Sequence, residues 1–67
     1  LPSEDLAPVV AALGRLRHEE RTAIVLVRSY GYSYAEVAQV LGVSETAVTN
    51  HLHRGMKRLR GILGVTR

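Results

Sequence analysis

The sequence predicts an all-α protein, a four-helix domain with a C-terminal helix-turn-helix. Apolar residues recur at spacings of three and four along most of the chain, which is the period of helices that bury one face. Serines that can cap a helix and glycines that can end one separate these apolar segments. No segment shows the alternation of a strand. The 67 residues are enough for one small domain, so residues 1–67 are expected to form a single unit.

The first helix is expected from about Ser3 to Leu16. Ser3 can serve as its N-cap. Proline is tolerated only within a first turn, so Pro8 leaves open a start later than Ser3. The expected buried stripe consists of Leu6, Val9, Val10, Leu13 and Leu16.

The second helix is expected from about Glu19 to Tyr30. His18, Glu19 and Glu20 have the polar character of a helix start, and Gly31 is suited to the helix end. Its expected buried stripe is Ala23, Ile24, Val27 and Tyr30. Tyrosines at positions 30, 32 and 34 could form an aromatic platform for the bases of single-stranded nucleic acid. We expect instead that Tyr30 and Tyr34 lie in the core and that Tyr32 is partly exposed.

The third and fourth helices together predict a helix-turn-helix over about residues 33–63. Ser33 and Glu36 have the spacing of a capping box at the start of a helix over 34–41, which Gly42 ends. Ser44 caps the fourth helix, which is expected to continue to about Leu63. Its apolar positions form one stripe: Val48, Leu52, Met56, Leu59 and Leu63. A short helix, a glycine turn and a longer helix are typical of this motif.

The face of the fourth helix opposite its apolar stripe carries polar side chains. Successive residues turn by about 100°, which places Thr46, Asn50 and Lys57 about 160° to 200° from Val48. We expect base reading by Thr46, Thr49, Asn50 and His53, because short donors and acceptors near the helix start reach base edges. Phosphate contact is expected from Ser33, His51, Arg54 and Lys57.

The charge distribution supports a polyanionic partner, nucleic acid first. The net charge is +3, but every acidic residue precedes residue 46, and the charged residues within 46–67 are all arginine or lysine. A basic end on a small domain favours binding to nucleic acid, although a solvated helix face remains an alternative. For Arg58 and Arg60, a solvated or protein-facing role is equally open.

Several other classes of function find no support in the residues. The chain has no cysteine, and His51 and His53 point apart on their helix, so no metal and no cofactor is expected. No catalytic triad or carboxylate pair is recognisable, so the chain is not expected to be an enzyme. The longest apolar run is too short to span a membrane. The chain begins at Leu1 rather than at Met, and we expect it to be a fragment of a longer protein.

Three stretches resemble region 4 of bacterial extracytoplasmic-function sigma factors. They run over residues 13–26, 30–44 and 48–60, and Gly-Tyr-Ser-Tyr-Ala-Glu-Val-Ala at 31–38 is their most specific part. The resemblance implies binding of double-stranded promoter DNA at the −35 element, docking on the β-subunit flap of the RNA polymerase core, and a role in transcription initiation in the bacterial cytoplasm. It also implies an anti-sigma factor as a potential partner.

By position, the resemblance implies DNA contact by Thr49, Asn50, His53 and Arg54. The chain also departs from the family pattern. The family often has Gly-Thr-Val where this chain has Thr-Ala-Val at 46–48, and it often has Arg at the positions of Thr49 and His51.

Two alternatives remain open from the sequence. Residues 48–52 and 63–67 resemble the LuxR-type output domain of transcription regulators. The chain could also be chiefly a protein-interaction module that docks on polymerase or on an anti-sigma factor.

Overall fold

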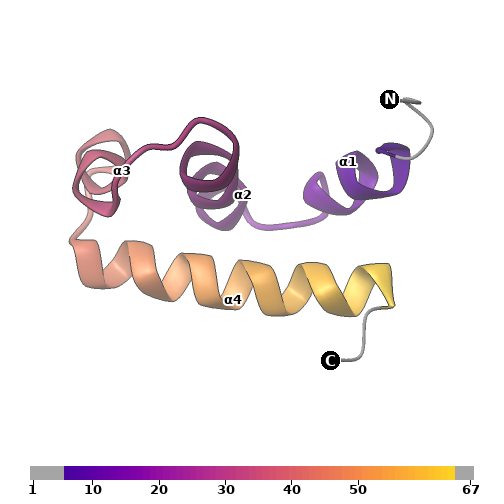
Figure 1. Ribbon diagram of the computed structural model, residues 1–67. Coiled ribbons are helices and arrows are strands. Elements are labelled where there is room, and N and C mark those ends of the chain that lie inside the picture. The colour runs from indigo at the N-terminus through magenta and orange to yellow at the C-terminus, as the bar shows by residue number, and fades with distance from the viewer. Residues whose placement is uncertain (1–5, 65–67) are drawn as a thin grey trace.

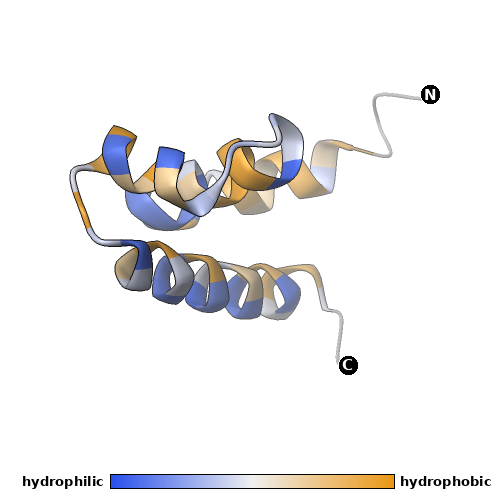
Figure 2. Cartoon of the chain, turned by 60° about the vertical axis from the view of Figure 1, so that its left-hand side comes forward, coloured by the Kyte–Doolittle hydropathy of each residue, from blue (hydrophilic) through white to orange (hydrophobic). Residues whose placement is uncertain are grey.

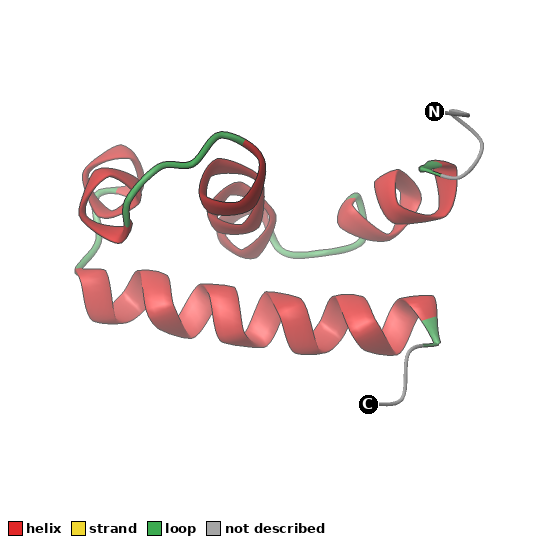
Figure 3. Cartoon of the chain, viewed as in Figure 1, coloured by secondary structure: helices red, strands yellow, loops and turns green. Residues whose placement is uncertain are grey.

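The computed structural model describes residues 6–64 and consists of helices joined by short loops, as Figures 1 and 3 show. The helices are α1 (Ala7–Leu13), α2 (His18–Ile24), which continues as η2 (Val25–Ser29), α3 (Tyr34–Leu41) and α4 (Glu45–Leu63). Residues 6–64 contain no strand. The prediction of an all-α domain with a C-terminal helix-turn-helix is therefore confirmed.

The long helix α4 lies along one side of the molecule, and α1, α2 and α3 lie in a row across it (Figure 1). The core between the two layers is formed by Leu16, Ala23, Ile24, Val37, Ala38, Val48 and Leu52. In Figure 2, the hydrophilic residues of α4 gather on the side turned away from the other helices. The layer above α4 therefore determines which face of this helix stays accessible.

Helix α1 begins later and buries less than the sequence predicts. Proline occupies its first turn, which confirms the later start, and the proposed cap Ser3 lies outside the described residues. The predicted buried stripe is wrong at Leu6 and Val10, which are 48% and 65% exposed. Because α1 has only seven residues and packs mainly against α4, one narrow side is covered, and Ala12 lies there.

The second helix widens at its end, and this changes the placement of the tyrosines. In η2 the backbone N–H of Tyr30 donates to the carbonyl of Val25, five residues back, at 3.3 Å. Such a wide turn shifts the helical phase, so Tyr30 leaves the buried stripe. Tyr30 is 69% exposed and Tyr34 is 43% exposed, so the prediction that both lie in the core is wrong. Tyr30 packs edge-on against Tyr32 instead.

The helix-turn-helix follows the predicted bounds and caps. The Ser33 hydroxyl accepts a hydrogen bond from the Glu36 backbone N–H at 3.1 Å, and the Glu36 carboxylate accepts one from the Ser33 N–H at 2.8 Å. Gly42 ends α3 with a φ of 69°, a conformation that favours glycine. The Ser44 hydroxyl then accepts from the Ala47 N–H at the start of α4. These local bonds fix where both helices of the motif begin.

Candidate nucleic-acid interface

The inward face of α4 is the apolar stripe that the sequence predicts, with one addition. Val48, Leu52 and Leu59 are buried, and so is Gly55, which sequence reasoning did not single out. Met56 and Leu63 are half-buried. Because this stripe is held against the rest of the domain, the opposite face of α4 projects into solvent along its whole length.

The proposed base-reading residues are all exposed: Thr46, Thr49, Asn50 and His53. Thr46 and Asn50 lie opposite the core, whereas Thr49 and His53 lie toward one flank of α4. The Thr49 hydroxyl donates its hydrogen to the backbone carbonyl of Glu45 at 3.1 Å. Since this hydrogen is used within the helix, Thr49 presents an acceptor oxygen and a methyl group to a ligand. Asn50 lies nearest the direction opposite the core and carries both donors and acceptors.

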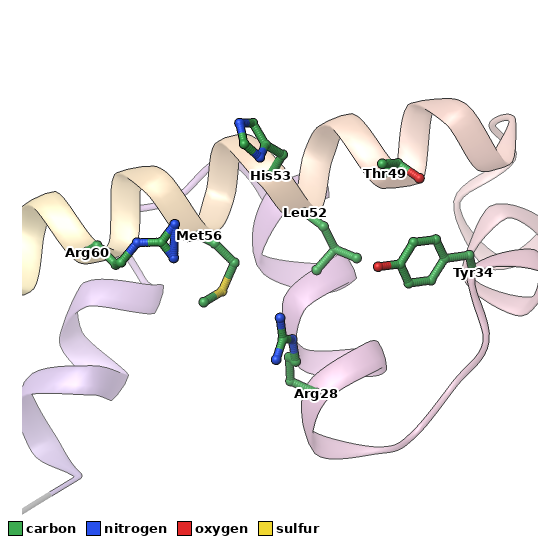
Figure 4. Close-up of a pocket in the computed structure, with 7 residues that line it drawn as sticks. All are labelled: Arg28, Tyr34, Thr49, Leu52, His53, Met56 and Arg60. Carbon is green, nitrogen blue, oxygen red and sulfur yellow. The ribbon is translucent and has the colours of Figure 1, made fainter. Parts of the chain in front are cut away.

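One flank of α4 forms a shallow cleft with the end of the second helix and the start of α3. The cleft has a volume of about 270 Å³ and is lined by Arg28, Tyr34, Thr49, Leu52, His53, Met56 and Arg60. Figure 4 shows Arg28 and Tyr34 pointing toward Leu52 from the elements that face α4. Sequence reasoning missed Arg28 and Tyr34 here, because only the packing of η2 and α3 brings them beside α4.

The other flank of α4 faces the start of α2 and mixes both signs of charge. It is lined by Arg17, Glu19, Glu20, His51, Arg54 and Arg58. Glu20, which the sequence suggests as a polar helix starter, is instead 2% exposed and pairs with Arg58 at 3.3 Å. For Arg58 the structure thus favours a protein-facing role. His51, a proposed phosphate contact, is half-buried on this flank.

The remaining proposed phosphate contacts are exposed. Arg54 and Lys57 lie on α4 beyond the base-reading positions, and Ser33 lies at the start of α3. The Ser33 oxygen already accepts the Glu36 N–H, so its hydroxyl hydrogen is the group that can donate to a phosphate. Ser33, Arg54 and Lys57 therefore each offer a donor to a polyanion.

Within residues 6–64 no group of three His, Cys, Asp or Glu side chains is placed to hold a metal ion. None of the helices in this range has the length and apolar character needed to cross a membrane.

A helix-turn-helix whose second helix is exposed, rich in donors and carries basic side chains defines a candidate DNA-binding domain. The family model described as "Sigma-70, region 4" matches residues 6–59. The chain belongs to this family, and its resemblance to region 4 of extracytoplasmic-function sigma factors is confirmed.

Curated relatives agree with the family match. The chain is 43% identical to the ECF RNA polymerase sigma factor SigM of Mycobacterium tuberculosis over 61 residues, which are 91% of this chain and 31% of that protein. It is 39% identical to the ECF RNA polymerase sigma factor SigX of Bacillus subtilis over 57 residues, 85% of this chain and 29% of the relative. Identity to the RNA polymerase sigma factor CarQ of Myxococcus xanthus is 38% over 53 residues, 79% and 30% of the two chains. The chain thus spans about a third of the length of these relatives.

Proposed function

We propose that this domain binds the −35 element of promoter DNA through α4, as part of a sigma factor that directs RNA polymerase to transcription initiation. The observation that carries the proposal is the outward face of α4, where exposed polar side chains lie opposite the buried stripe of Val48, Leu52 and Leu59. Membership in the region 4 family supports the same role and favours it over the LuxR-type alternative.

The residues divide by their place along α4. In a helix-turn-helix, the start of the second helix enters the major groove, where base edges present distinct patterns of donors and acceptors. Thr46, Thr49, Asn50 and His53 occupy this start and are proposed to read bases. Arg54 and Lys57 follow, where the helix passes the phosphate backbone. Ser33 and His51 are proposed as further phosphate contacts, Ser33 through its hydroxyl hydrogen and His51 from the flank beside Arg54.

The partners follow from the same proposal. Region 4 of a sigma factor works with RNA polymerase, and we propose the β-subunit flap as the docking point and an anti-sigma factor as a potential competitor. Leu6 and Val10 of α1 leave apolar surface exposed away from the outward face of α4, so protein docking and DNA binding would use different surfaces. The proposed role is one of binding rather than catalysis, carried out in the bacterial cytoplasm.

The test compares a proposed base reader with proposed phosphate contacts. Asn50→Ala should weaken binding to a cognate duplex by ~1–3 kcal/mol and relax the preference over a scrambled duplex. Arg54→Ala or Lys57→Ala should weaken binding to both duplexes by similar factors and make the slope of log K against log salt shallower by ~1. Titrations of labelled duplexes at several salt concentrations measure both quantities.

Glu45→Gln is a suitable control, because Glu45 is exposed on the first turn of α4 but lies outside the proposed contacts. Circular dichroism should show the same helical signal for all variants, since none of the substituted side chains is buried. If the Arg54→Ala, Lys57→Ala double variant keeps both its affinity and its salt slope, the basic end does not bind DNA, and a protein-interaction module becomes the better interpretation.

A further inference from the structure

Among residues 6–64, Glu20 is the charged residue that is buried. It belongs to α2, and its side chain faces α4. Its carboxylate oxygen Oε1 accepts a hydrogen bond from the Arg17 backbone N–H at 3.3 Å. The same oxygen lies 3.3 Å from Nε of Arg58 on α4. A carboxylate removed from water needs such donors, because an unpaired buried charge is strongly destabilising. Glu20 therefore ties the start of α2 to the second half of α4.

This contact depends on a close approach of the two helices at Gly55. A Cβ atom at Gly55 would lie 3.1 Å from Cβ of Glu20 and 2.8 Å from Cδ1 of Ile24. Since glycine has no side chain, the α4 backbone covers Glu20 directly. Arg58 lies three residues further along α4, and its side chain, 47% exposed, bridges from the surface to the buried carboxylate.

By its place on α4, Arg58 would be a phosphate contact. It follows Arg54 by four residues, so the two lie about 40° apart around the helix and about 6 Å apart along it. Both line the same cleft. Arg58 would thus extend the row of phosphate contacts by one turn, were its guanidinium not turned toward α2 and compensated by Glu20.

We propose that Glu20 is a positioning residue that holds Arg58 against α2 and keeps it out of contact with DNA phosphate. The inference rests on the proposed binding of DNA by α4. Glu20 offsets the charge of Arg58 and directs its Nε toward α2. Turning the guanidinium to a phosphate would weaken this pair and leave the buried carboxylate with a poorer donor. An arginine that contacts phosphate adds to binding at every sequence alike. Withholding Arg58 therefore leaves a larger share of the binding free energy to the base contacts.

The salt dependence of binding counts phosphate contacts and so tests the proposal. Each contact contributes about 0.9 to the slope of log K against log salt. Arg58→Ala should leave the slope of the unsubstituted chain unchanged, whereas Arg54→Ala should lower it by about 0.9. Glu20→Gln, which keeps an acceptor for the Arg17 N–H, should release Arg58 and steepen the slope by about 0.9, a further ~3.5-fold loss of affinity between about 50 and 200 mM salt. The double variant Glu20→Gln, Arg58→Ala should return to the original slope.

Glu19→Gln is the matched control, because Glu19 lines the same cleft, is exposed, and loses the same charge. Its slope should stay unchanged. Equal steepening by Glu19→Gln and Glu20→Gln, or a shallower slope for Arg58→Ala, would overturn the proposal. Arg58→Ala leaves the buried Glu20 carboxylate without its ionic partner, so this variant, like Glu20→Gln, can fail to fold. The double variant, which removes both charges, then decides: a slope shallower than that of the unsubstituted chain would overturn the proposal. A chain that binds duplex without any salt dependence would instead contradict the proposed function itself.

Discussion

Replacing Gly55 with leucine should destabilise the protein, whereas the same replacement at Gly61 should stabilise it slightly. Both glycines lie inside α4, and leucine is favoured over glycine in a helix by ~0.7 kcal/mol at either position. A Cβ atom at Gly61 meets nothing within 4 Å, but at Gly55 it would lie 2.8 Å from Cδ1 of Ile24 and 3.1 Å from Cβ of Glu20. The two variants therefore differ chiefly in what the added side chain meets.

The expected size follows from these contacts. Forcing a larger side chain into a closely packed interface costs ~1–3 kcal/mol. After the gain in helix propensity, Gly55→Leu should lose ~1–2 kcal/mol and Gly61→Leu should gain ~0.5 kcal/mol. For a domain of this size, the resulting difference of ~1.5–2.5 kcal/mol corresponds to ~6–20 °C in Tm.

Thermal unfolding followed by far-UV circular dichroism measures this difference directly. The two variants carry the same added side chain, so the comparison cancels the intrinsic preference of leucine for a helix. Equal Tm values for Gly55→Leu and Gly61→Leu would refute the close approach of α2 and α4, and with it the physical basis for the burial of Glu20.

Three further predictions concern the core, a helix cap and pH. Leu52→Ala should lower the free energy of unfolding by ~2–5 kcal/mol, because Leu52 is 6% exposed. Val40→Ala, at a site that is 59% exposed, should change this free energy by less than ~0.5 kcal/mol. Similar unfolding midpoints of the two variants in urea would contradict this prediction. Ser44→Ala should cost ~1 kcal/mol through loss of the hydrogen bond from the Ala47 N–H, and an unchanged midpoint would argue against the cap. Hydrogen bonds from Ser33 hold the pKa of Glu36 below its ordinary value of 4.5. The charged form of Glu36 therefore stabilises the fold above about pH 4.5, and this stabilisation is lost as the pH falls through the lower pKa of the folded state. Glu36→Gln should remove this part of the acid sensitivity. If acid unfolding curves of the two proteins superimpose, the prediction is wrong.

The helix-turn-helix was predictable because its bounds depend on contacts between neighbours in the chain. Ser33 with Glu36 and Ser44 with Ala47 are pairs three residues apart, so their hydrogen bonds join residues within one helical turn. The apolar spacing of α4 likewise sets its inward face, and through it the outward face. The proposed contacts at Asn50, Arg54 and Lys57 follow from this phase, and they stay predictions until DNA binding is measured.

The first half of the chain was less predictable, because its apolar residues exceed what the small core can cover. Val10 and Tyr30 fit a buried stripe by spacing, yet both are exposed. Helix α1 is too short to be covered on a broad face, and the wide turn of η2 shifts the phase at its end. The spacing of apolar residues alone indicates neither how much of a helix face other helices cover nor where a helical turn is irregular.

The sequence by itself determined the helical class, the caps and bounds of α3 and α4, the polar face of α4 and the resemblance to region 4, because each of these is encoded by residues a few positions apart. Only the tertiary structure decided that Glu20 is buried beside Gly55, that Arg58 pairs with it, and that Arg28 and Tyr34 flank α4. These features depend on how closely two helices approach. The distance between two helices is set by packing between side chains that are far apart in the chain, so a local sequence pattern does not predict it.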